Sequence, residues 1–126
     1  MNDAKKTVWE RYVSSWNASS GAERRELFAQ ALAPDCSYRD PQTETRGWDE
    51  LERWMADFHA SMPGTRFATQ TFSTHHRCSV ARWVMSNAAG VALGEGISYG
   101  EYDAAERLVA ISVFFDVPEQ ERGNPA

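Results

Sequence analysis

Segments with helical periodicity come first in this chain, and most segments with strand character follow them. Apolar side chains recur every three or four residues in residues 4–18, 20–32 and 48–62, which predicts three amphipathic helices. Alternating or β-branched and aromatic residues predict four strands, at 66–74, 79–88, 91–102 and 108–117. This order indicates an α+β domain in which helices cover one face of a strongly curved sheet.

Local signals set the expected element boundaries. Ser20 and Glu23 fit a capping box at the start of the second helix, and Pro34 is expected to end that helix. The piece CSYRDP (36–41) is expected to be extended, and QTETR (42–46) is expected to be a loop before the third helix.

The length of 126 residues fits a single domain, 1–126, with a core over 5–117 and a frayed polar tail over 118–126. A chain of this size needs no metal or disulfide to be stable. Cys36 and Cys78 form no CxxC pair and have no zinc-ligand spacing, so we expect two reduced thiols and no metal site.

Charge excludes some classes of partner. The chain has 13 Lys and Arg against 18 Asp and Glu, a formal charge of −5, so nucleic acid is not an expected partner. The N-terminus lacks an apolar signal region and no run is long enough to span a membrane, so a cytoplasmic protein without a membrane partner is expected.

Small residues occupy alternate positions of the third predicted strand. Gly94, Gly96, Ser98 and Gly100 therefore share one face, which is either a cavity floor or a bend that needs glycine. The segment GEGISYG is not a dinucleotide-binding loop, because strands lie on both sides of it. No cofactor motif is present, and no cofactor is expected.

Several segments together resemble a known superfamily. These are ERYVSSWNASSG (10–21), the element YRDP (38–41) followed by Gly47 and an amphipathic helix, and the closing strands that end in ISVFFD. They resemble the nuclear transport factor two-like superfamily, and within it the ketosteroid isomerases and SnoaL-like polyketide cyclases. The resemblance implies a cone-shaped, cystatin-like barrel, a curved mixed sheet wrapped around three N-terminal helices, with an apolar pocket between helices and sheet.

The resemblance also implies candidate catalytic residues. Tyr12 and Asp40 match the tyrosine and the base of the isomerases, in which a carboxylate removes a proton next to a carbonyl and the tyrosine stabilises the enolate. Ser98 stands where those enzymes have a second acid. Loss of such a donor costs on the order of 3 kcal/mol, so we expect a related isomerisation, cyclisation or dehydration of another small apolar carbonyl compound.

Positions on the family's cone suggest the residues that bind this ligand. Tyr38 is two residues before Asp40 and shares its face if the segment is extended. The full set of expected wall residues is Tyr38, Trp16, Trp54, Phe58, Trp83, Ile111 and Phe115. Each of them is also compatible with a place in the ordinary core.

The residues alone leave alternatives open. Asp40 before Pro41 also fits a turn, Tyr12 also fits the core, and a non-catalytic ligand-binding domain of the same fold is the rival function. His59 has a catalytic role only if it faces the pocket. The adjacent His75 and His76 should diverge, and Asp116 suits a cavity rim or a dimer contact. An apolar outer sheet face predicts a homodimer.

Overall fold

The computed structural model describes residues 3–116. Its helices are α1 (Asp3–Trp16), α2 (Gly21–Ala31) and α3 (Trp48–Ser61). Its strands are β1 (Leu32–Asp40), β2 (Thr43–Arg46), β3 (Arg66–His75), β4 (Cys78–Ser86), β5 (Ala92–Tyr102) and β6 (Leu108–Phe114). The three predicted helices and four C-terminal strands are present, with small differences at their ends.

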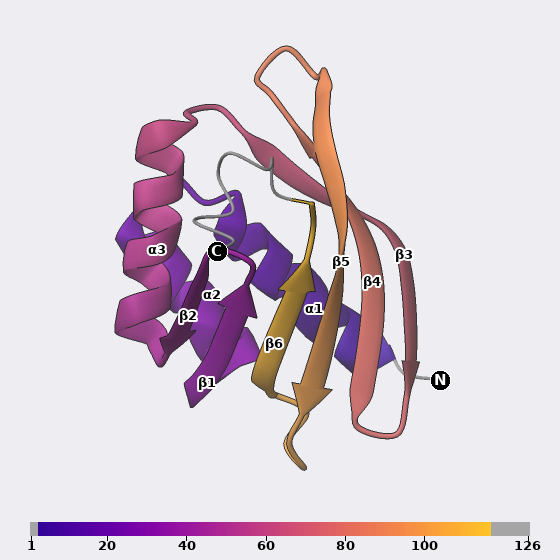
Figure 1. Cartoon of the computed structure of the whole chain (residues 1–126). Helices are drawn as coiled ribbons and strands as arrows, with labels where there is room; N and C mark the ends of the chain where they lie inside the picture. Colours follow the sequence, from indigo (N-terminus) through magenta and orange to yellow (C-terminus); the bar gives the residue numbers. More distant parts are fainter. Residues whose placement is uncertain (1–2, 117–126) are drawn as a thin grey trace, which may run out of the picture.

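The strands of the described part form one six-stranded sheet in the order β2-β1-β6-β5-β4-β3. Strands β1 and β6 pair in parallel and every other neighbour is antiparallel, so the sheet is mixed. Figure 1 shows the sheet curving from β2 to β3, with α1 crossing one face of β6, β5 and β4. The predicted α+β class with a curved mixed sheet is confirmed.

The segment between α2 and α3 differs from the prediction. The second helix ends at Ala31, and Pro34 lies inside β1, where the pairing with β6 is irregular between Leu32 and Ser37. An irregular stretch tolerates a residue without an N–H group. The predicted loop QTETR instead contains β2, because Asp40 pairs with Thr43 to close a tight hairpin.

Cap residues explain where two helices begin. The Ser20 hydroxyl accepts a hydrogen bond from the backbone N–H of Glu23 at 3.1 Å, as the capping-box pattern predicts. The Glu23 carboxylate turns to Ser19 instead of completing the box at Ser20. Gly47 begins α3 with φ = 86°, a conformation that glycine adopts without strain.

The core lies between the helices and the inner face of the sheet. The large side chains with less than 2% of their surface exposed include Trp9, Phe28, Leu32, Leu51, Met55, Leu108 and Ile111. Both cysteines are free thiols, and Cys36 is buried in this core. Because α1, α2 and α3 each contribute to it, the core fixes these helices against the inner face of the sheet.

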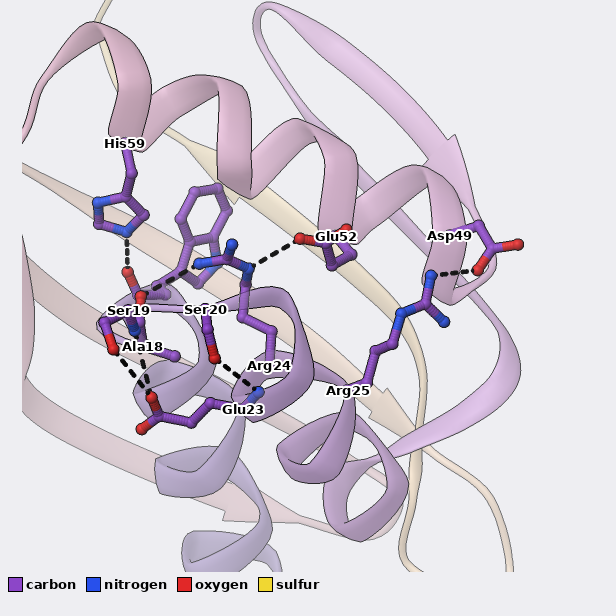
Figure 2. A network of polar contacts seen from close by, with 10 residues as sticks. Ala18, Ser19, Ser20, Glu23, Arg24, Arg25, Asp49, Glu52 and His59 are labelled. Carbon is purple, nitrogen blue, oxygen red and sulfur yellow. Dashed lines mark hydrogen bonds and ion pairs between the residues drawn. The ribbon is translucent and has the colours of Figure 1, made fainter.

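A polar network joins the three helices (Figure 2). The buried Arg24 on α2 donates to the Glu52 carboxylate on α3 at 3.1 Å and to the Ala18 carbonyl at 3.1 Å. The His59 ring contacts the Trp16 carbonyl at the end of α1. The network therefore anchors the C-terminal end of α1, where two of the expected site residues lie.

We expect Arg24→Ala to lower the free energy of unfolding by about 3 kcal/mol, because it leaves the half-buried Glu52 carboxylate unpaired and the Ala18 carbonyl without a donor. Arg25→Ala is the matched control, because Arg25 is on the same helix and pairs with Asp49 at the surface. Arg25→Ala should lower the free energy of unfolding by less than about 0.5 kcal/mol. Urea titration of both variants measures the difference, and equal losses would contradict a structural role for the buried pair.

Candidate active site

A cavity of about 480 Å³ opens between α1, α3 and the inner face of the sheet. Six of the seven expected wall residues line it, namely Trp16, Tyr38, Trp54, Phe58, Trp83 and Phe115. Ile111 is the exception: it is 1% exposed, belongs to the core and is absent from the described lining. Ile111 pairs with Tyr38 on β1 and Gly100 on β5.

Asp40 ends β1 at the wall of this cavity, and its two carboxylate oxygens have different partners. Oδ1 accepts hydrogen bonds from the backbone N–H groups of Gln42 (2.7 Å) and Thr43 (3.0 Å), which is the turn geometry expected of aspartate before proline. Oδ2 accepts a hydrogen bond from the Tyr38 hydroxyl at 2.6 Å. A turn role and a catalytic role for Asp40 are therefore compatible. The turn uses one carboxylate oxygen and leaves the other on the cavity side with Tyr38.

Tyr12 lies on the α1 wall, and its hydroxyl has a built-in partner. The Trp16 indole N–H donates to the Tyr12 oxygen at 2.9 Å, so the phenol proton stays available for an acceptor in the cavity. Burial raises the pKa of Tyr12 well above its usual value, while the Trp16 hydrogen bond lowers it. Tyr12 is therefore neutral at physiological pH and has a proton to donate.

Tyr38 is held neutral in the same way. Burial is the main reason that its pKa rises well above the usual value, and the neighbouring Tyr12 and Asp40 raise it further. The Tyr38 ring packs against Trp16 with ring centroids 5.9 Å apart. Tyr38 shares the inward face with Asp40 as predicted, and its hydroxyl fixes the position of the Asp40 carboxylate.

Ser98 completes a set of three polar groups on the wall. Its side chain is 3% exposed and lines the cavity, and none of the hydrogen bonds within residues 3–116 involves its hydroxyl. The structure thus brings Tyr12, Asp40 and Ser98, which come from α1, β1 and β5, to the wall of one cavity.

The small-residue face of β5 has two uses. A Cβ atom at Gly94 would lie 3.9 Å from the nearest atom, so this glycine borders open space in the cavity wall. A Cβ at Gly96 would lie 2.2 Å from Trp83, and one at Gly100 would lie 2.9 Å from Leu108 and 3.1 Å from the Ser79 hydroxyl. These two glycines make room for side chains of the protein itself, so only part of the face is a cavity floor.

Several lining residues were not predicted from the sequence. They include Trp9, Val13, Phe67, Met62, Met85 and Val113. Trp9 and Val13 lie on the same α1 stripe as Tyr12 and Trp16, so that stripe could have identified them. Phe67 is positioned by the Asn17 side-chain amide, which bonds both the N–H (2.8 Å) and the carbonyl (2.9 Å) of Phe67, a long-range pairing with no local signal.

The remaining candidates lie at the rim or elsewhere. Asp116 and Glu95 are exposed and border the cavity. His59 contacts the Trp16 carbonyl and is not part of the described lining. The prediction that His75 and His76 diverge is wrong, because their Nδ1 atoms are 3.1 Å apart across a turn in which His76 has φ = 50°.

The buried tyrosines predict a pH dependence of stability. Burial raises the pKa of Tyr102 from its ordinary value of 10.0 to about 12, and the pKa values of Tyr12 and Tyr38 also rise. Above pH 10 the unfolded chain loses these protons while the folded protein keeps them, so stability is complete below pH 10 and falls as the pH rises. The slope is about 1.4 kcal/mol per pH unit for each tyrosine.

Urea unfolding between pH 8 and pH 11 measures this slope, and Tyr12→Phe should reduce it by the share of one tyrosine. An unchanged slope in that variant would contradict the buried, neutral state of Tyr12.

The described residues contain no group of three or more His, Cys, Asp and Glu side chains arranged to hold a metal ion. Within the same residues, no helix is long and apolar enough to cross a membrane.

Solved structures share this architecture. A candidate isomerase of the SnoaL-like family from Agrobacterium tumefaciens superimposes with a TM-score of 0.82 at 23% identity, covering 88% of this chain and 96% of that one. A candidate polyketide cyclase from Sinorhizobium meliloti gives 0.67 at 11% identity, covering 85% and 93%. A cystatin-like protein of unknown function from Methylobium petroleophilum gives 0.76 at 14% identity, covering 100% and 84%.

Likeness at these identities establishes the nuclear transport factor two-like fold and leaves the reaction open. No curated protein sequence matches the chain. The model of the SnoaL-like domain matches residues 9–120, a span that includes Tyr12, Asp40 and Ser98. The chain therefore belongs to the SnoaL-like domain family.

Proposed function

We propose that this protein is a cofactor-independent enzyme that transfers a proton at the carbon next to the carbonyl of a small apolar compound, as an isomerase, cyclase or dehydratase does. The observation that carries the proposal is the Asp40 carboxylate. One of its oxygens is fixed by two backbone amides, and the other lies beside Tyr38 in an aromatic cavity. A carboxylate held in this way loses little freedom when it acts as a base.

The proposed steps use only residues of the cavity wall. Asp40 takes the proton from the carbon next to the carbonyl, the electron pair of the C–H bond forms a C=C bond with the carbonyl carbon, and the π electron pair of the carbonyl moves onto its oxygen. The free proton of Tyr12 and the hydroxyl of Ser98 stabilise the negative charge that develops there. The protonated Asp40 then returns its proton to another carbon for isomerisation, or to a leaving hydroxyl for dehydration.

Tyr38 has a positioning role in this scheme. Its hydroxyl donates to Asp40 Oδ2 and holds the carboxylate on the cavity side. Tyr12 has a different role because its oxygen already accepts the Trp16 N–H, which leaves its own proton for the ligand. In this scheme Tyr38 orients the base and Tyr12 binds the oxygen of the ligand.

The test combines binding with proton exchange. Apolar aryl ketones and cyclic enones are screened for an increase in melting temperature, and those that bind are incubated with the protein in D₂O. Proton NMR should show deuterium entering next to the carbonyl faster with the native protein than with heat-denatured protein.

The second candidate function is ligand binding without catalysis. The observation that favours it is the Asx-type turn, which gives Asp40 a structural reason to be present. The same screen separates the two functions. Ketones that stabilise the protein but gain no deuterium would support the binding function and exclude proton transfer on those compounds.

We also propose that the protein is a homodimer formed through the outer face of the sheet. The exposed apolar side chains Val80, Ile97, Tyr99 and Phe114 are neighbours across β4, β5 and β6, because Val80 pairs with Tyr99 and Ile97 pairs with Phe114. A patch of this kind favours association with a second copy.

Light scattering coupled to size-exclusion chromatography should give the mass of a dimer for the native protein and of a monomer for Phe114→Lys. Phe114 is 62% exposed, so this change should leave the fold intact. Phe114→Leu is the control and should remain dimeric. A native protein that is monomeric at micromolar concentration would contradict the proposal.

A further inference from the structure

The charges around the cavity all have one sign. Asp40, Glu95 and Asp116 are among the residues that border it, and the described lining contains no Lys, Arg or His. A cavity with low-dielectric walls is screened by water less than an open surface, so these charges act strongly on a ligand at the mouth. An anionic group on the ligand would be repelled by all three carboxylates.

One cation, Arg82, lies beside the rim without an ion pair to it. Arg82 borders a separate shallow groove that shares Glu95 and Asp116 with the cavity. Among the ion pairs of residues 3–116, none joins Arg82 to Glu95 or Asp116. The chain as a whole has a formal charge of −5, which adds to the local field.

The wall between the base and the rim is a continuous series of aromatic rings. Neighbouring ring centroids are 5.9 Å apart for Tyr38 and Trp16, 5.4 Å for Trp16 and Phe67, 5.6 Å for Phe67 and Trp83, and 6.2 Å for Trp83 and Phe115. Aromatic faces attract cations through their quadrupoles, and walls of this kind bind quaternary ammonium groups.

Two hydroxyl groups on the wall have protons without an acceptor and define where the ligand's oxygen lies; the buried indole N–H of Trp9 also has no partner within the described residues. The Ser98 hydroxyl is almost fully buried, lines the cavity and makes no hydrogen bond within the described residues. The phenol proton of Tyr12 is also unused, because Trp16 donates to the Tyr12 oxygen. Each can donate to an acceptor in the cavity, so we place the polar oxygen of the ligand at this inner wall, which leaves its charged end for the rim.

We infer that the ligand of this cavity is an organic cation, an apolar carbonyl compound that carries an ammonium group. Its carbonyl oxygen lies against Tyr12 and Ser98, its apolar body lies among the aromatic rings, and its ammonium group lies at the rim of Glu95 and Asp116. The position of the carbonyl rests on the proposed function. The preference for positive charge does not, because it follows from the charges and rings of the wall.

Three ketones of similar size test the preference by isothermal titration. Phenacyltrimethylammonium is cationic, 3,3-dimethyl-1-phenylbutan-1-one is its neutral isostere, and 3-benzoylpropanoate is anionic. We expect the cation to bind roughly tenfold more tightly than its isostere, and the anion to bind more weakly than either. Added salt should reduce the difference between the cation and the isostere.

Variants locate the effect at the rim. Glu95→Gln combined with Asp116→Asn should weaken binding of the cation severalfold and leave the isostere unchanged. Glu101→Gln is the control, because Glu101 is exposed on the same strand β5 and does not border the cavity. It should change neither affinity.

A neutral isostere that binds as tightly as the cation would overturn the inference. These experiments measure binding only, so they separate the two proposals. Tight binding of the cation without deuterium exchange on any ketone would support the charge preference and remove the catalytic proposal. Deuterium exchange that is confined to neutral ketones would support the catalytic proposal and overturn the charge preference.

Discussion

Asp40→Asn should slow deuterium uptake by a bound ketone by roughly 10³-fold, because an amide cannot take the proton that the carboxylate takes. The substitution should leave the fold intact. Asparagine can still accept the backbone N–H groups of Gln42 and Thr43 through its oxygen, and its NH₂ group can donate to the Tyr38 oxygen. The melting temperature and ketone affinity should therefore stay close to those of the native protein.

The control for this variant is Asp35→Asn. Asp35 lies on the same strand and its side chain is exposed away from the cavity, so its replacement should change neither exchange nor binding. Exchange that survives in Asp40→Asn would remove Asp40 from the role of the base. Loss of exchange together with unfolding would instead show that the turn is its main contribution, and circular dichroism separates these outcomes.

Gly96→Ala should lower the free energy of unfolding by about 3 kcal/mol, near the upper end for overpacked sites. An added Cβ would lie 2.2 Å from Cζ2 of Trp83 and 2.6 Å from the backbone oxygen of Phe114. The indole could move, but the carbonyl is part of the β6 backbone, and Trp83 is part of the cavity wall. Urea titration should therefore show a loss of stability, and ketone affinity should fall with it.

Gly94→Ala is the matched control on the same strand and the same face. Its Cβ would meet only Met85 Cε, at 3.9 Å, which is an ordinary contact. Alanine in a strand also loses less conformational entropy on folding than glycine, so stability should stay the same or rise by up to about 1 kcal/mol. Equal destabilisation by the two variants would show that strand curvature, and not the packing of Trp83, explains the glycines.

The sequence was sufficient for the fold because its periodic segments are long and consistent. The stripe on α1 and the alternation on β3 to β6 each extend over several residues, and the helix-first order left few architectures. The segment between α2 and α3 was predicted less well. Pro34 ended a helix in the prediction but lies in an irregular stretch of β1, because tertiary pairing with β6 outweighs its local preference.

The site was partly predictable for a similar reason. Tyr38 and Asp40 share a face whenever their segment is extended, and the hydrogen bond between them follows from that. The division of the Asp40 carboxylate between turn and cavity could not be predicted, since it depends on the two-residue hairpin that β2 closes. Ile111 was misplaced because the position on the cone did not distinguish the cavity from the packed core behind it.

The glycine face shows the same limit. Alternate small residues on β5 predict room on one side of the sheet, but whether a ligand or another side chain fills that room depends on partners distant in sequence. Trp83 occupies the space at Gly96 and Leu108 the space at Gly100, while the space at Gly94 stays open. Only the structure separates these cases.

The most direct measurement is a crystal structure of the protein with the ketone that gives the largest rise in melting temperature. We expect the ketone oxygen to lie within hydrogen-bonding distance of the Tyr12 hydroxyl, and the carbon next to the carbonyl to lie beside Asp40 Oδ2. A ketone bound outside the cavity, or inside it with its oxygen turned away from Tyr12 and its acidic carbon far from Asp40, would contradict this expectation.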